Sequence, residues 1–338
     1  MLGTTPDLLR LLVVPVFAWA AYRDIETRRL PNRLWYPLVA LGVCLLLWDL
    51  AGRWPLAGFE DRLFLIRVGF SLFFVVPLSY GFWWIGGFGG ADAKALMTLA
   101  VVFPTFPTYT VGSLDLPMVE PLLGVFSMTI LTNTVVVALV YPLLLLVRNL
   151  AVGDVAPVMF LGRRTAVDDL RTEHGRLFET REGFTRSGLD LDALRMYLRW
   201  RGSTLADVRT NPDEHRDPAS VGQTFEPTDG AVGDDPVADG GSVSDNDVVE
   251  PADVAGDDAW AAERFLDEIE GTAYGTSAES LREGLELVAA RDTVWISPGL
   301  PFVVPMFGGL LVALTYGDLL FGVLGLVGVA ELVTLLGV

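Results

Sequence analysis

The chain has 338 residues, of which 51% are hydrophobic, and it carries a formal net charge of −18 with a mean hydropathy of +0.45. The acidic charge argues against a nucleic-acid partner, because such a partner requires a basic face. The single cysteine, Cys44, excludes an internal disulfide and a four-cysteine zinc site. Several apolar runs approach the ~20 residues that cross a bilayer, so the composition predicts a polytopic membrane protein.

The apolar runs predict membrane spans in chain order. They lie at about 8–22, 34–50, 63–85, 92–111 and 121–147, with a last run in 300–338. That last run is too long for one crossing at about 1.5 Å per residue, and residues 315–318 are typical of a turn that divides it. We therefore expect an all-α polytopic membrane protein with six or seven transmembrane helices. The sequence leaves this choice and the oligomeric state open.

The loops predict an orientation and a domain organisation. Four arginines follow the first span, namely Arg23, Arg28, Arg29 and Arg33, whereas residues 104–120 hold no basic residue. Because basic residues near spans mark the cytoplasmic side, we expect the 23–33 and 85–92 loops to face the cytoplasm. We expect a membrane domain at 1–147, a cytoplasmic insert at 148–298 and a C-terminal membrane segment at 299–338.

The insert is acidic and uneven in composition. The pattern predicts an amphipathic helix that begins at Asp190 or Asp192, and two acidic helices at 257–270 and 277–290. Residues 202–256 hold few large apolar side chains, so they cannot offset their ordering entropy and are expected to be disordered. Abundant acids with almost no lysine are typical of a salt-adapted protein and suggest a halophile. One acidic disordered loop would also account for much of the charge.

Two aspartates stand at the expected cytoplasmic edge of the membrane domain. Asp24 ends the first span, and Asp92 begins the fourth span directly after Gly89, Gly90 and Ala91. Charges at membrane depth cost at least about 2.5–3.5 kcal/mol, so they usually face a partner or a wet cavity. Two neighbouring carboxyl groups share a proton, and one can then activate a water while the other polarises a carbonyl. This chemistry hydrolyses a peptide without a metal or other cofactor.

Other interpretations of these residues stay open at this point. Asp24, among its arginines, would more often be a solvated or paired charge, and Asp92 has the position of an N-cap. Asp24, Asp92 and Glu331 could instead line the pathway of an ion-coupled transporter or channel. Against transport, both motif acids sit at one membrane edge rather than at the midplane. A third alternative is a scaffold whose acidic insert docks a partner.

Taken together, the two motifs resemble a known family. Asp24 with a basic run and Leu30-Pro31-Asn32, followed by Gly-Gly-Ala-Asp-Ala-Lys at 89–94, resembles the archaeal prepilin and preflagellin peptidases, which are intramembrane aspartyl proteases. The segment TVWISPGLPFVVPM at 293–306 is similar as well, whereas 202–256 is not covered. Ala91 departs from the Gly-x-Gly-Asp form of the motif. The cysteine tetrad of the bacterial relatives is absent, which removes most grounds for their N-methyltransferase activity.

The resemblance implies catalytic residues, a class of substrate and a cellular location. It assigns Asp24 and Asp92 as the catalytic pair, with supporting roles for Pro31, Asn32, Gly89, Gly90, Ala91 and Lys94, the only lysine of the chain. It implies a multi-pass enzyme of the cell membrane that removes the short basic leader (class III signal peptide) from pilin and archaellin precursors at the cytoplasmic edge. Those precursors and the lipid bilayer are the implied partners.

Two further expectations concern how the site works. Glu26 is a candidate for attracting the basic residues of the leader, although a solvated loop residue is the commoner role. We also expect Asp92 to move toward Asp24 when substrate binds.

Overall fold

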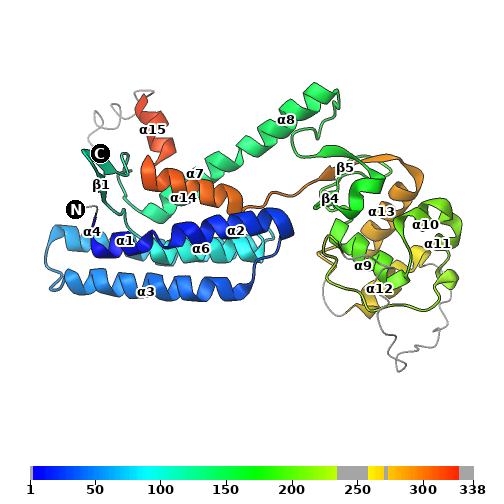
Figure 1. Cartoon of the computed structure of the whole chain (residues 1–338), viewed down its shortest axis with the longest axis horizontal. Coiled ribbons are helices and arrows are strands. Elements are labelled where there is room, and N and C mark those ends of the chain that lie inside the picture. Colours follow the sequence, from blue (N-terminus) through cyan, green and yellow to red (C-terminus); the bar gives the residue numbers. More distant parts are fainter. Residues whose placement is uncertain (1–2, 234–257, 270–272, 327–338) are drawn as a thin grey trace. The chain divides into compact units, whose positions relative to one another are not determined.

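The computed structural model describes residues 3–233, 258–269 and 273–326, and the chain divides into two compact units (Figure 1). The first unit comprises Met1–Tyr141 and Pro301–Val338, and the second comprises Pro142–Leu300. Each unit has its own hydrophobic core, so each is described by itself.

Apolar helices build the first unit. They are α1 (Thr5–Arg10), α2 (Val13–Thr27), α3 (Trp35–Gly52), α4 (Phe59–Phe70), α5 (Val76–Trp84), α6 (Gly90–Val102), α7 (Phe126–Ala138), α14 (Val303–Thr315) and α15 (Leu319–Leu326). A π-helical turn, Ser71–Val75, joins α4 to α5, and α8 (Val140–Val152) follows α7 almost directly. Three stretches in the described residues are long and apolar enough to cross a membrane: Asn32–Gly52, Phe59–Trp84 and Phe126–Val152.

The three long stretches coincide with the spans expected at 34–50, 63–85 and 121–147. The span expected at 92–111 is wrong in its second half, because α6 ends at Val102. The chain then forms an antiparallel hairpin of β1 (Tyr109–Val111) and β2 (Leu114–Leu116). Pro104 and Pro107 stand between helix and hairpin, where proline cannot continue a helix. The turn expected at 315–318 is confirmed, since α14 ends at Thr315 and Gly317 has a φ of 101°.

Close helix packing holds the first unit together. Helix α14 packs against α7, α2 and α6, and α3 packs against α6. A Cβ atom at Gly309 would lie 2.6 Å from the backbone nitrogen of Thr134, and one at Gly42 would lie 2.9 Å from Cγ2 of Val102. Glycine at these positions lets neighbouring helices approach closely, as is common between helices in membranes.

A buried ion network joins three helices at the other end of α6 from Asp92. The Arg10 side chain is 3% exposed, and it donates to Oδ1 of Asp7 at 2.7 Å and to the Asp49 carboxylate. Its Nε donates to the backbone oxygen of Val102 at 2.8 Å. Arg10 therefore ties α1 to α3 and to the last turn of α6.

Replacing Arg10 by methionine should destabilise the protein strongly. Arg10→Met leaves the Asp7 and Asp49 carboxylates without their cation, which in other buried networks costs about 3–5 kcal/mol. The matched control is Arg62→Met, because Arg62 is exposed on α4. Thermal unfolding of the solubilised protein should show a large fall in Tm for Arg10→Met alone. Equal Tm values for the two variants would contradict the role given to the network.

The second unit combines a small sheet with short helices. Its strands are β3 (Arg163–Ala166), β4 (Arg176–Leu177) and β5 (Thr293–Ser297), and its helices beyond α8 are α9 (Leu191–Arg201), α10 (Leu205–Thr210), α11 (Pro212–Arg216), α12 (Ala262–Glu268) and α13 (Ala278–Ala290). The sheet is antiparallel with the order β3-β5-β4. Tyr197, Trp200, Trp260 and Phe265 lie in its core.

Some expectations for the fold are wrong. An all-α fold is contradicted by the two sheets, because the β-branched and aromatic run TVWIS forms the middle strand of one of them. Disorder throughout 202–256 is contradicted by α10 and α11. Leu205 and Val208 of α10, and Val221 after α11, are buried in the core of the unit. Residues 234–257 lie outside the described residues.

The helices expected in the insert are largely confirmed. Asp190 is the N-cap of α9, since its side chain accepts the N–H of Asp192 at 2.9 Å. Helix α13 matches the helix expected at 277–290 closely. Helix α12 is shorter than expected, because Trp260 and Ala261 have positive φ values of 67° and 52° and hold the chain out of a regular helix just before it.

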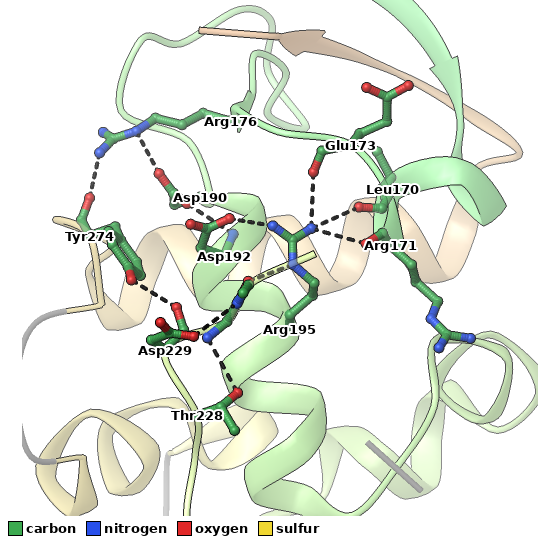
Figure 2. A network of polar contacts seen from close by, with 12 residues as sticks. Leu170, Arg171, Glu173, Arg176, Asp190, Asp192, Arg195, Thr228, Asp229 and Tyr274 are labelled. Carbon is green, nitrogen blue, oxygen red and sulfur yellow. Dashed lines mark hydrogen bonds and ion pairs between the residues drawn. The ribbon is translucent and has the colours of Figure 1, made fainter. Parts of the chain in front are cut away.

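One buried arginine fastens the loops of this unit around α9 (Figure 2). Arg195 is 6% exposed and lies in the middle of the helix. It donates to the Asp192 carboxylate and to the backbone oxygens of Leu170, Arg171, Glu173 and Gly230. The fork of guanidinium donors suits such a ring of carbonyls, and a lysine could not serve them all.

Glu286 on α13 forms a second network. It accepts from Arg216 at 2.7 Å, from Arg181 at 2.6 Å and from Nε1 of Trp260 at 3.0 Å. The hydrogen bond from Arg216 is the largest influence that lowers the pKa of Glu286 below its ordinary value of 4.5. A lowered pKa means that this carboxylate stabilises the fold above about pH 4.5 and ceases to do so as the pH falls through its folded value.

Replacing Glu286 by glutamine should therefore have a pH-dependent cost. At pH 7, Glu286→Gln should lower stability by about 1–3 kcal/mol, since it removes hydrogen bonds to charged groups. The difference from wild type should shrink at pH values below the ordinary pKa of glutamic acid. Thermal unfolding of the full chain at pH 7 and at acidic pH measures both effects. Glu283→Gln, on the same helix, is the control; a deficit that is the same at both pH values would contradict the assignment.

Candidate active site

Asp24 lies on the buried side of α2. The residues that helix α2 turns into the core are Val13, Phe17, Ala20, Ala21 and Asp24, which recur at helical spacing. Asp24 is 6% exposed, and within the described residues its Oδ2 atom has no hydrogen-bond partner. The backbone amide of Val303, at the start of α14, interacts with the same carboxyl group. A buried acid with an unsatisfied oxygen is rare in folded proteins and marks a candidate functional site.

Asp92 lies at the beginning of α6, as the third residue of the helix. Gly89 is the N-cap residue, and the Oδ2 of Asp92 accepts its backbone N–H at 3.1 Å. This is the carboxylate half of a capping box, since glycine has no side chain to make the return bond. A Cβ atom at Gly89 would lie 2.9 Å from that oxygen, which explains a glycine there. Gly86 has a φ of 75°, a conformation that glycine adopts at no steric cost, where the chain turns out of α5.

Asp24 and Asp92 lie close enough for their carboxyl groups to interact. The carboxyl groups of Asp24 and Asp92 interact electrostatically, and the guanidinium of Arg28 interacts with both. Their helices, α2 and α6, both pack against α14. The site therefore combines two acids from separate helices with one cation at the end of α2.

Asn32 and Lys94 form a second link between the two motifs. Nζ of Lys94 donates to Oδ1 of Asn32 at 2.6 Å. Pro31 precedes the 3₁₀ turn Asn32–Leu34 and accepts the N–H of Leu34 at 3.1 Å, which presents Asn32 at the start of α3. Gly90 and Ala91 occupy the first turn of α6, where a Cβ atom at Gly90 would make only an ordinary contact with Trp83. The bond between Asn32 and Lys94 fixes the loop after Asp24 to the helix of Asp92.

Two groups at the site have no motif that points to them. Arg28 marks the cytoplasmic side and belongs to the basic run after Asp24, but neither pattern assigns it to the carboxyl pair. Its position four residues after Asp24 puts it one helical turn away. It ends α2 in the left-handed region, with a φ of 55°. Val303 contributes a backbone amide, for which a side-chain pattern carries no signal.

The described residues hold no cluster of three or more His, Cys, Asp or Glu side chains that could bind a metal ion. The candidate site consists of two carboxyl groups, one guanidinium and backbone amides. Glu331, the third acid considered for an ion pathway, lies outside the described residues.

Two protein-family models match this chain. The model of the type IV leader peptidase family matches residues 11–143, and the model of the archaeal peptidase A24 C-terminus, type II, matches residues 257–319. The chain belongs to the archaeal A24 peptidases. It is therefore a peptidase of the prepilin peptidase type, which is an aspartic protease. Comparison with curated proteins and with solved structures gives no match.

The two matched segments of this peptidase meet at Asp24. Asp24 and Asp92 both fall within 11–143, and Val303, whose amide interacts with Asp24, falls within 257–319. The resemblance seen in the sequence is thus confirmed at the level of the family.

The Asn32–Lys94 bond should position the peptidase site rather than react. Lys94→Met and Asn32→Leu should each lower kcat/KM for a leader-bearing precursor by about ten-fold, the loss expected for one charge-assisted hydrogen bond. The double variant should lose no more than either single variant, because both remove the same bond. Lys94→Arg, which keeps a donor, should retain more activity than Lys94→Met. Losses that multiply in the double variant would show that the two residues act separately.

Proposed function

We propose that this peptidase is an intramembrane aspartyl endopeptidase that removes the short basic leader from pilin and archaellin precursors. One observation supports this more than any other: two aspartates from separate helices interact while one of them has an unsatisfied, buried oxygen. A pair of acids in this arrangement can hold one proton between them, which suits acid–base catalysis on a peptide bond.

In the proposed reaction, one carboxylate of the Asp24–Asp92 pair takes a proton from a water molecule, whose oxygen attacks the scissile carbonyl carbon. The other, protonated carboxyl donates a hydrogen bond to the carbonyl oxygen, where negative charge develops. The tetrahedral intermediate collapses when the leaving nitrogen receives a proton from the pair. The leader leaves with a new carboxylate, the mature chain has a new amine, and both aspartates return to their starting state.

The bilayer is the proposed setting, with six or seven spans and the active site at the cytoplasmic edge. The exposed apolar side chains of α3, α5 and α8 support burial in lipid, as they include Leu47, Trp48, Trp84, Leu143 and Leu144. The basic loop at 23–33 supports a cytoplasmic position for Asp24. A precursor has its leader on the cytoplasmic side and its apolar helix in the bilayer. The junction between leader and helix would therefore lie at this edge. The acidic composition supports a salt-rich habitat for the protein.

Cleavage should depend on both aspartates. A tagged precursor with a basic leader and an apolar helix is mixed, at high salt, with membranes that contain wild type, Asp24→Asn or Asp92→Asn. We expect each variant to lose at least about 100-fold in rate, which is the lower range for removing a general acid or base. The matched control is Asp115→Asn, an exposed aspartate on the β2 strand, which should cleave like wild type.

Equal insertion of all variants, checked by membrane extraction and thermal unfolding, makes the comparison valid. Undiminished cleavage by Asp24→Asn or by Asp92→Asn would show that the pair is wrongly assigned. Failure of the wild type on several leader sequences would favour the transporter or channel alternative.

A further inference from the structure

Helix α2 has a second, outward side with its own pattern. Trp19, Tyr22, Arg23 and Glu26 follow one another at the spacing i, i+3, i+4, i+7, so they form one stripe along the helix. The stripe is open to the surroundings, since Trp19 is 45% exposed and Tyr22 is 60% exposed. Asp24 belongs to the opposite, buried side of the same helix.

The stripe lines an open pocket at the end of α2. Arg28 ends α2 in a left-handed conformation. Arg29, Leu30 and Pro31 then complete the lining, and the pocket has a volume of about 630 Å³. All of its residues belong to the first unit.

The charge of the pocket is positive on balance. Arg23 and Arg29 contribute two guanidinium groups, whereas Glu26 contributes one carboxylate. Glu26 already accepts the hydroxyl of Tyr22 at 2.5 Å. Arg23 is exposed, and its guanidinium interacts electrostatically with Tyr22. A basic leader would be repelled here, so Glu26 is poorly placed to attract one.

We propose that this pocket binds the phosphate headgroup of an anionic membrane lipid. Guanidinium groups form paired, charge-assisted hydrogen bonds with phosphate oxygens. Trp19, Tyr22 and Leu30 offer apolar and amphipathic surface beside these cations, which is the combination found where spans leave the bilayer. A free phosphate ion would use the cations alone and leave this apolar surface without a function. The proposal rests on the membrane setting of the proposed function, but not on catalysis.

Lipid binding can be measured without any peptidase assay. Native mass spectrometry of the full-length protein, in a neutral detergent, is carried out with phosphatidylglycerol and with phosphatidylcholine. Wild type is compared with Arg23→Gln/Arg29→Gln and with Arg33→Gln, a control that removes an exposed arginine of the same loop outside the pocket. We expect wild type to prefer phosphatidylglycerol. The double variant should lose roughly thirty-fold in affinity, in line with the usual contribution of two basic residues, and Arg33→Gln less than three-fold.

Three results would overturn the proposal. One is equal affinity of wild type for the two lipids, and another is an equal loss in Arg33→Gln and the double variant. The third is displacement of phosphatidylglycerol by glycerol 3-phosphate at similar concentration, which would make this a site for a soluble phosphate. Selective lipid binding by a protein that cleaves no precursor would support the proposal and refute the proposed function, so the two fail separately. Matching thermal unfolding curves establish that the variants are folded.

Discussion

The packing of α14 against α2, α6 and α7 is the interaction on which the candidate active site depends. Helix α14 begins at Val303, whose amide interacts with Asp24, and its body contacts both aspartate-bearing helices. Gly309 lets α14 approach the backbone of α7 to a distance that a Cβ atom would forbid. In a membrane, helix association relies on such close contacts, because lipid supplies little hydrophobic drive. Helix α14, near the end of the chain, therefore positions two aspartates from the first third of the chain.

Helix α2 has a buried side and an exposed side, because its period of 3.6 residues separates the side chains into two faces. One side carries Phe17, Ala20 and Asp24 into the core, and the other presents Trp19, Tyr22 and Arg23 outward. The left-handed conformation at Arg28 ends the helix and therefore both of these patterns. It costs roughly 1–2 kcal/mol for a residue with a Cβ atom. The same residue brings its guanidinium to Asp24 and Asp92, so the strained turn and the electrostatics of the site share one position.

Much of the candidate site could be predicted from the sequence, because its chemistry comes from side chains that stand in recognisable motifs. Asp24, Asp92, Gly89 and Lys94 stand in two motifs, and their family was evident from them. The sequence did not indicate that Asn32 is the hydrogen-bond partner of Lys94, because this bond depends on how α3 and α6 pack. Val303 lies in the segment 293–306 that resembles the family, but no side-chain pattern there indicates that its backbone amide would reach Asp24.

Errors in the predicted fold came from reading hydropathy without local chemistry. Residues 103–111 are apolar enough to extend a span, but prolines stop α6 and a hairpin follows. The segment TVWIS is apolar enough to approach a membrane, yet its β-branched residues pair as a strand with β3 and β4. Residues 202–233 are polar on average, and a few apolar side chains still suffice to dock α10 and α11 on the core.

The central claim is that Asp24 and Asp92 form a pair, and short-range crosslinking tests it most directly. The double variant Asp24→Cys/Asp92→Cys is made in a Cys44→Ser background, because Cys44 is the only native cysteine and is exposed. It is treated in substrate-free membranes with a short bifunctional thiol reagent, beside Glu26→Cys/Asp92→Cys, which places one thiol on the outward side of α2. The account predicts rapid intramolecular crosslinking of the first pair and little of the second. No crosslink in the first pair, or equal yields in both, would contradict it.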